Sequence, residues 1–171
     1  MRYLLLVSLA FPLACRVPLP GSERQVASLA GHLSPTEQRA LEAIRRIHEP
    51  GAGLIQRLRT SGLLADSAEW WVAGPPDVLP FAGTWRGLVG VAEFQRQLGL
   101  TMRYDTVEVR EYLVSGEQVA AIFLGAGVAR ATGNSFRSEI VRLYTFRDGK
   151  IIRVRNYYDT DSYARAVQRK P

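Results

Sequence analysis

Apolar residues recur along this chain first with the period of a helix and then with the alternation of a β-strand. Ser34, Pro35 and Glu37 form a capping box, so a helix is expected to begin there, with Leu41 and Ile44 on its apolar face. The pattern predicts helices over 35–49, 52–60, 88–98 and 161–168, strands over 68–73, 104–114, 118–130, 135–147 and 150–159, and an irregular loop over 74–87. Helices followed by an antiparallel meander predict an α+β fold, a cone-shaped curved antiparallel sheet wrapped over N-terminal helices.

The strongest local signal is Asp148-Gly149, which lies between two strands rich in β-branched and aromatic residues and predicts a tight hairpin turn. A two-residue turn pairs Arg147 with Lys150. Regular pairing then places Val141 opposite Asn156 and Glu139 opposite Tyr158, all on one face. That face is apolar in its middle and polar at its far end, which is typical of the floor of a pocket for a small hydrophobic ligand.

Basic residues give this chain of 171 residues a formal net charge of +6, and their distribution bears on its partners. Most arginines are spread along the sequence, which favours a solvated basic surface and no nucleic-acid partner. The exception is the second face of the terminal hairpin, which carries Ile140, Arg142, Tyr144, Phe146, Ile151, Arg153, Arg155 and Tyr157. We interpret this amphipathic face as the contact with a second copy of the chain, and we expect a homodimer.

The amino terminus has the pattern of a targeting segment. A basic start and an apolar run over 3–14 predict a secretory signal peptide over 1–15, followed by a tether over 16–33 and one domain over 34–171. Cys15 ends the apolar run in a way that resembles a bacterial lipoprotein signal, so it is the candidate lipidation site and would attach the protein to a membrane in the cell envelope. Two alternatives stay open: an ordinary cleaved signal, or a mis-assigned start codon upstream of a cytoplasmic domain.

The order of the predicted elements resembles the SnoaL-like, or ketosteroid-isomerase-like, branch of the nuclear transport factor two-like superfamily. The likeness rests on four segments within about 34–167: 69–87, with Trp70, Trp71 and Trp85; 91–94; 146–151; and 156–160. The resemblance implies a curved sheet around a ligand cavity. It does not imply one reaction, because this superfamily includes isomerases, cyclases, epoxide hydrolases, dehydratases and proteins without known chemistry.

The family's catalytic carboxylates are not retained. Ketosteroid isomerases carry their base at a position that here corresponds to Trp71, and the Asp-Arg-Asp set of limonene epoxide hydrolases is absent. By analogy with SnoaL-type cyclases, Glu139 is the candidate general acid or base, since a carboxylate beside apolar side chains has a raised pKa. The alternative is that Glu139 lies in water or pairs with Arg137 or Arg103.

The other candidates follow from position and residue type. His48 lies on the apolar face of the first helix and is a second candidate catalytic residue, with a satisfied core histidine as the alternative. Asn156 and Tyr158 are candidates for binding a ligand carbonyl or hydroxyl, and Trp71 and Trp85 for stacking on it. Hydrogen bonds within the sheet and simple core packing are the alternatives for these four residues.

Neither a metal nor a cofactor is expected. His32 and His48 are the only histidines and Cys15 is the only cysteine, which leaves too few ligands for a typical site. The sequence has no phosphate-binding glycine loop, nucleophile elbow or dinucleotide fingerprint. Three functions fit: a cofactor-independent isomerase- or cyclase-type enzyme acting on a hydrophobic carbonyl compound, a non-catalytic ligand-binding protein of the envelope, and a dimeric interaction module.

Overall fold

The computed structural model describes residues 32–49 and 53–168. The predicted signal peptide, its lipidation site Cys15 and most of the predicted tether lie outside these residues. Within them, no helix is long and apolar enough to cross a membrane.

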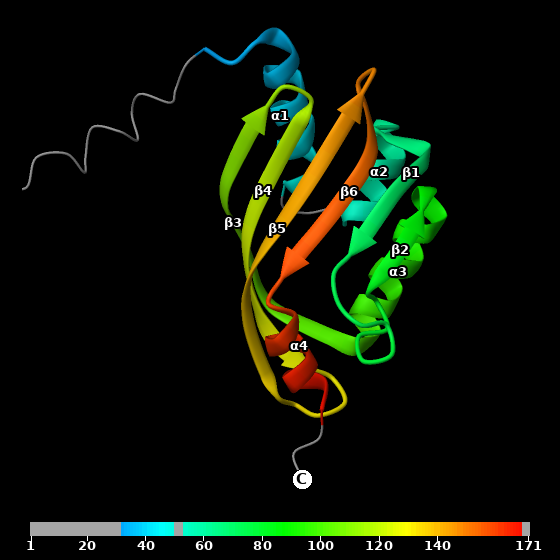
Figure 1. The fold of residues 1–171 in the computed structure, drawn as a ribbon, viewed down its shortest axis with the longest axis vertical. Helices are drawn as coiled ribbons and strands as arrows, with labels where there is room; N and C mark the ends of the chain where they lie inside the picture. The colour runs from blue at the N-terminus through cyan, green and yellow to red at the C-terminus, as the bar shows by residue number, and fades with distance from the viewer. Residues whose placement is uncertain (1–31, 50–52, 169–171) are drawn as a thin grey trace, which may run out of the picture. The chain divides into compact units, whose positions relative to one another are not determined.

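The described residues form four helices and one six-stranded sheet, and the predicted α+β fold is confirmed (Figure 1). The helices are α1 (Pro35–His48), α2 (Leu54–Ser61), α3 (Gly87–Thr101) and α4 (Thr160–Val167). The strands are β1 (Leu64–Val72), β2 (Gly83–Arg86), β3 (Met102–Ser115), β4 (Gln118–Ala129), β5 (Ser135–Arg147) and β6 (Lys150–Tyr158). Strand β2 lies in the segment that the sequence predicted to be an irregular loop.

The sheet has the order β2-β1-β6-β5-β4-β3 and curls around the helices without closing. Helices α1 and α3 pack against one face of it, behind the strands as viewed in Figure 1, and α2 packs against both helices. All neighbouring strands are antiparallel except β1 and β6, which are parallel. The sheet is therefore mixed, because β1 precedes the meander in sequence and joins its edge at β6.

The predicted capping box is confirmed. The Ser34 hydroxyl accepts a hydrogen bond from the Glu37 backbone N–H, and the Glu37 carboxylate accepts one from the Ser34 N–H. The second oxygen of Glu37 accepts from the Gly116 N–H at 2.9 Å, in the turn between β3 and β4. These hydrogen bonds lower the pKa of Glu37, and the one from Gly116 has the largest effect. One carboxylate thus caps α1 and fastens it to the sheet.

The hairpin of β5 and β6 contains a β-bulge that the sequence did not reveal. Arg147 pairs with Lys150 and Phe146 with Ile151, as predicted, but Thr145 then pairs with Arg153. Ile152 is the extra residue, and beyond it the register is shifted by one. Asn156 therefore pairs with Arg142, and Tyr158 with Ile140. The predicted pairings of Asn156 with Val141 and of Tyr158 with Glu139 are wrong.

The shift puts Asn156 of β6 on the same face as Arg142 of β5, and this is the inner face, opposite to the one that we predicted for β5. Ile140 and Tyr144 are buried and Arg142 is half-buried on the face toward the helices, together with Asn156. Glu139 and Arg155 are exposed on the outer face. The β5 part of the predicted pocket floor, with Glu139 and Val141, is thus on the outside, whereas Asn156 of β6 is inside as expected. Of the basic and aromatic residues predicted to contact a second copy, Arg153, Arg155 and Tyr157 remain exposed.

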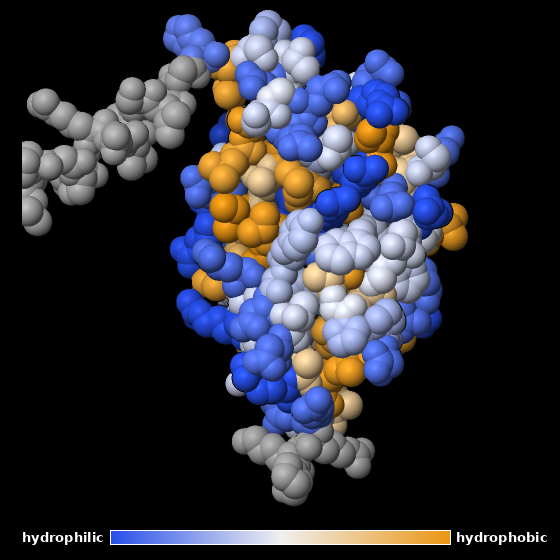
Figure 2. All heavy atoms as spheres, viewed as in Figure 1, coloured by the Kyte–Doolittle hydropathy of each residue, from blue (hydrophilic) through white to orange (hydrophobic). Residues whose placement is uncertain are grey.

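The outer face is not wholly polar, which explains why the sequence alone did not distinguish inside from outside. Ile122 pairs with Val141 and Ala120 with Leu143, and all four are only half-buried. Figure 2, which views this face, shows hydrophobic surface bordered by hydrophilic surface.

The bend of the sheet depends on a close approach between β3 and β4. A β-bulge lies between Tyr104 and Thr106 on β3, opposite Gly127 on β4. A Cβ atom at Gly127 would overlap the backbone carbonyl of Arg103. Glycine lets the two backbones come this close, and the strands can bend there.

Candidate functional site

A cavity of about 310 Å³ lies between the sheet and the helices. Most of its wall is apolar, and nitrogen-bearing side chains occupy one part of it. The lining residues are Ile47, His48, Glu49, Leu54, Arg57, Gln95, Leu98, Tyr104, Val107, Val109, Phe123, Ile140 and Arg142. A smaller void of about 30 Å³ shares Arg142 and Tyr104 with this cavity and is lined also by Asn156, Tyr158 and Tyr163. Arg142 lies where the two spaces meet.

Arg142 is held in place by an amide and by aromatic rings. Its Nε donates to Asn156 Oδ1 at 2.6 Å, and its Nη1 donates to Tyr144 Oη at 3.5 Å. The guanidinium carbon lies 5.3 Å from the ring centroids of both Trp70 and Phe123, within the range of a cation–π interaction. The Asn156 amide is itself fixed, because its Nδ2 donates to the Trp71 carbonyl at 3.0 Å. No carboxylate within residues 32–49 and 53–168 forms an ion pair with Arg142.

His48 lies beside this arginine and is neutral near pH 7. Its Nε2 is 2.8 Å from Tyr144 Oη, and its Nδ1 is 3.4 Å from Tyr112 Oη. Burial, and then the charges of Arg142 and Arg57, lower the pKa of His48 to about 3. A neutral imidazole has one nitrogen without a proton, and that nitrogen can accept one. His48, Tyr144 and Arg142 therefore form one connected polar group in the cavity wall.

Three tyrosines surround the smaller void: Tyr163, which is buried, and Tyr104 and Tyr158, which are half-buried. Tyr104 Oη lies 2.7 Å from Tyr163 Oη, and Tyr158 Oη donates to the Ala73 carbonyl at 2.5 Å. Burial raises the pKa of all three phenols, so each keeps its proton at neutral pH. The Tyr104–Tyr163 contact joins α4 to β3, and α4 thereby covers this end of the interior.

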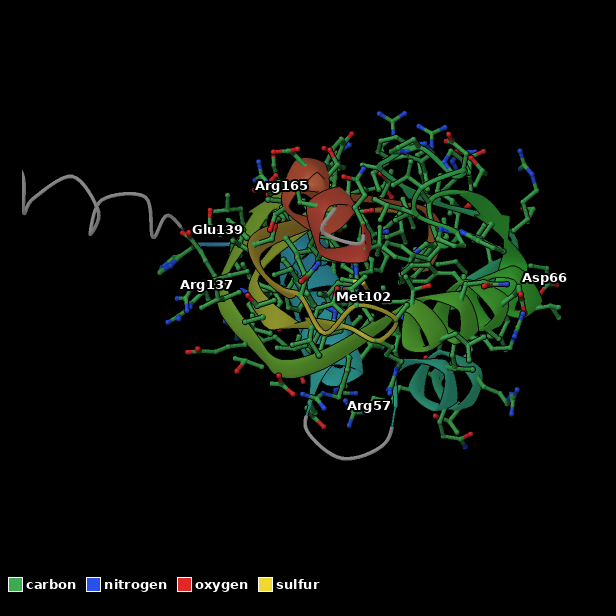
Figure 3. The ribbon with its side chains drawn as sticks, turned by 90° about the horizontal axis from the view of Figure 1, so that it is seen from below. Arg57, Asp66, Met102, Arg137, Glu139 and Arg165 are labelled. Carbon is green, nitrogen blue, oxygen red and sulfur yellow. The ribbon has the colours of Figure 1, made fainter. Side chains whose placement is uncertain are left out.

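Glu139, our first candidate for the acid or base, is not in the cavity. It is exposed on β5, between Ser138 and Ile140, whose side chains are buried on the opposite face. Seen from below in Figure 3, Glu139 and Arg137 lie outside the curl of the sheet, whereas α1 lies inside it. The prediction fails because the apolar side chains around Glu139 belong to the outer face.

The two tryptophan candidates are also outside the cavity. Trp71 projects from the outer face, where its ring packs against Tyr157 with centroids 5.4 Å apart. Its neighbour Trp70 is fully buried on the inner face, beneath Arg142, and its Nε1 has no hydrogen-bond partner within the described residues. Trp85 is half-buried and donates from Nε1 to the Phe81 carbonyl at 3.1 Å. It is not among the residues that line the cavity.

The other three candidates are brought together around a residue that we had assigned to the wrong face. His48 lines the large cavity, Asn156 and Tyr158 line the small void, and Arg142 connects them. One signal in the sequence could have identified Arg142. It is the only charged residue among the alternate positions of β5 that also carry Ile140, Tyr144 and Phe146, so it stands alone on an apolar strand face. Within the part of the chain that is described, no group of three or more histidine, cysteine or acidic residues could hold a metal.

Comparison with known proteins places this geometry in context. The model of the SnoaL-like domain matches residues 57–154. The chain is similar to an NTF2-like protein from Burkholderia xenovorans LB400, with 24% identity and a TM-score of 0.66 over 79% of this chain and 100% of that one. It is also similar to a proposed SnoaL-like polyketide cyclase from Jannaschia sp. CCS1, with 18% identity and a TM-score of 0.69 over 82% and 99% of the two chains.

A third solved structure is TerC co-crystallised with polyporic acid, with 21% identity and a TM-score of 0.58 over 75% of this chain and 98% of that one. At these identities the likeness to solved structures concerns the fold. No curated protein matches the chain significantly.

Proposed function

Because the chain belongs to the SnoaL-like domain family, whose model matches more than half of it, we propose that it binds a small hydrophobic carbonyl compound and moves a proton on it without a cofactor. The observation that carries this proposal is the pair formed by Arg142 and His48 in the wall of an otherwise largely apolar cavity. Arg142 is a cation that forms no ion pair with a carboxylate of the described residues, and His48 is an uncharged base.

The two side chains have complementary roles in this proposal. The Arg142 guanidinium donates to the carbonyl oxygen of the ligand, and the unprotonated nitrogen of His48 takes a proton from the adjacent carbon. The electron pair of the broken C–H bond moves to the oxygen, which becomes an enolate held by Arg142. If the ligand has a C=C bond next to that carbon, the enolate is conjugated with it, and return of the proton to the far carbon of the double bond completes an isomerisation.

The low pKa of His48 is consistent with such a step. The free imidazole is a weak base because burial, and then the charges of Arg142 and Arg57, disfavour its charged form. An enolate beside Arg142 offsets that repulsion, so the basicity of His48 rises as the negative charge develops. Solved structures of similar fold include proteins proposed as a polyketide cyclase and as an isomerase, which is the same broad class of chemistry.

Binding without turnover is the second candidate. Among the described residues, Glu49 is the only acidic one that lines the cavity, and it is exposed, so they offer no buried carboxylate there as a stronger base. A protein with this wall could bind an organic molecule and leave it unchanged. TerC, a protein of similar fold, has been crystallised with such a molecule, polyporic acid.

Deuterium exchange distinguishes the two candidates. The bound compound would be extracted from protein purified from its own host, identified by mass spectrometry, and returned to the protein in D₂O. We expect the protein to accelerate exchange at the carbon next to the carbonyl. His48→Gln should slow this exchange by about 10²- to 10⁴-fold, the usual contribution of a general base, while the ligand still binds.

Glu139→Gln is the matched control, because it also removes a titratable group but lies on the outer face. Its exchange rate should equal that of the wild-type protein. Binding without any exchange would favour the second candidate, and unchanged exchange in His48→Gln would exclude His48 as the base.

A further inference from the structure

The outer face of the sheet carries an apolar strip that is open to solvent. Leu113 on β3 is 52% exposed, and the strip continues from it over half-buried residues of β4 and β5. Its members are Leu113, Ala120, Ile122, Leu124, Val141 and Leu143. Figure 2 shows hydrophobic surface on this face. A contiguous apolar patch on a folded domain is typical of an interaction site.

Beside this strip, β6 and β1 form a shallow hollow with aromatic walls. Its volume is about 270 Å³, and it is lined by Glu69, Trp71, Arg155 and Tyr157. The Trp71 and Tyr157 rings pack together, and Tyr157 is 40% exposed. Tryptophan, tyrosine and arginine are enriched in the contacts between proteins. The hollow is therefore suited to an apolar side chain of a partner.

Two charged residues lie on opposite sides of the apolar strip. Glu111 is on β3 and Arg155 is on β6, and neither forms an ion pair within residues 32–49 and 53–168. Strands β4 and β5 lie between them, so they are about 14 Å apart and cannot pair within one chain. Glu108, the next carboxylate on this side of β3, already pairs with Arg110 at 3.1 Å.

The register places the exposed leucine and the hollow at the same height on the sheet. One row of paired residues runs from Leu113 on β3 through β4 and β5 to Arg155 on β6 and Trp71 on β1. Glu111 belongs to the adjacent row, which ends at Tyr157. A two-fold axis parallel to the strands, between β4 and β5, keeps each row at its height and exchanges the positions of β3 and β6.

Such an axis makes this face complementary to itself. Leu113 of each copy comes to lie over the hollow of the other, and Glu111 of each copy comes to lie next to Arg155 of the other. Packed sheets are about 10 Å apart, a distance that a glutamate and an arginine side chain span together. A surface that fits its own copy after a two-fold rotation forms an isologous interface.

We infer that a second copy of the chain covers the outer face of the sheet, related to the first by this two-fold axis. The partner is a second copy because the exposed leucine and the hollow, and likewise the acid and the base, are all on one chain. The inference is independent of the proposed function, since the cavity lies on the opposite side of the sheet. Arg142 and Tyr144, which the sequence assigned to this contact, take no part in it because they face the cavity.

Sedimentation equilibrium of the full chain measures the dissociation constant of the dimer. Leu113→Ala should raise it by about tenfold, because the leucine side chain is lost from two hollows. Arg155→Glu and Glu111→Arg should each raise it by about tenfold or more in about 50 mM salt, because each reversal places like charges together at two symmetric contacts. The double variant Glu111→Arg/Arg155→Glu restores opposite charges and should return the dissociation constant to within about threefold of the wild type.

Arg59→Glu is the matched control, because it makes the same charge change at an exposed position of α2, on the helix side of the sheet. It should leave the dissociation constant within about twofold of the wild type. A wild-type chain that stays monomeric at about 100 μM would overturn the inference, and so would a dimer that the three single substitutions leave unchanged. A double variant that associates no better than the single variants would overturn the two-fold arrangement, because Glu111 and Arg155 would then not face each other.

Discussion

Gly127→Ala is expected to destabilise the protein by about 3 kcal/mol or more, because its added methyl group meets backbone atoms that cannot move independently. The Cβ would overlap the carbonyl of Arg103 and lie against the Cα of Tyr104. These atoms belong to the bulge in β3, where β3 and β4 bend together. Relief of the overlap would separate the two strands at the place where the sheet curves around the cavity.

Gly99→Ala is the control for this substitution. Gly99 lies in α3 with no atom within 4 Å of the position that a Cβ would occupy. Alanine favours helix more than glycine does, so this variant should be more stable by up to about 1 kcal/mol. Urea unfolding of the three proteins measures both differences. Equal stability of Gly127→Ala and the wild type would show that β3 and β4 do not approach as closely as described.

Acid should destabilise the protein through His48. The pKa of His48 is about 3 in the folded protein, against an ordinary value of 6.5. Between these values the unfolded chain binds a proton that the folded protein does not, so the free energy of unfolding falls as the pH falls. The loss approaches about 1.4 kcal/mol per pH unit, about 2 kcal/mol between pH 7.5 and pH 5, and ends below about pH 3.

Unfolding in urea at pH 7.5, 6 and 5 tests this expectation on the wild type and on His48→Gln. The variant should lose about 2 kcal/mol less than the wild type over this interval, because glutamine does not titrate. Carboxylates with a lowered pKa also make the folded protein less stable in acid, and Glu93, with its hydrogen bonds to Arg96, is one of them. They are protonated mainly below pH 5, outside the measured interval. Parallel pH curves for the two proteins would mean that folded His48 accepts a proton as easily as a solvated histidine does.

Local signals in the sequence predicted the elements well. The capping box gave the start of α1, and Asp148-Gly149 gave the hairpin turn. Each of these signals depends on contacts within a few residues. Strand β2 was missed because it pairs with β1 from inside a segment rich in proline and glycine.

The site was harder to predict than the fold, because it depends on which sheet face is the inner one. Strand β4 is apolar on both faces, with Phe123 inside and Ile122 and Leu124 outside, so its pattern does not distinguish the two. The bulge at Ile152 then shifts the register without changing any residue type. Together these features led to the choice of Glu139 and hid Arg142, whereas His48 was found because α1 has a single apolar stripe.

The bulge at Ile152 also bears on how proteins of this fold can diverge. Because an extra residue in β6 decides which of its side chains reach the interior, the gain or loss of one codon in this hairpin can replace part of the cavity wall while leaving the strands in place. An arginine and an asparagine that meet in one lineage can be separated in the next without either being substituted. Homologues should therefore be grouped by the length of this hairpin before their interior residues are compared.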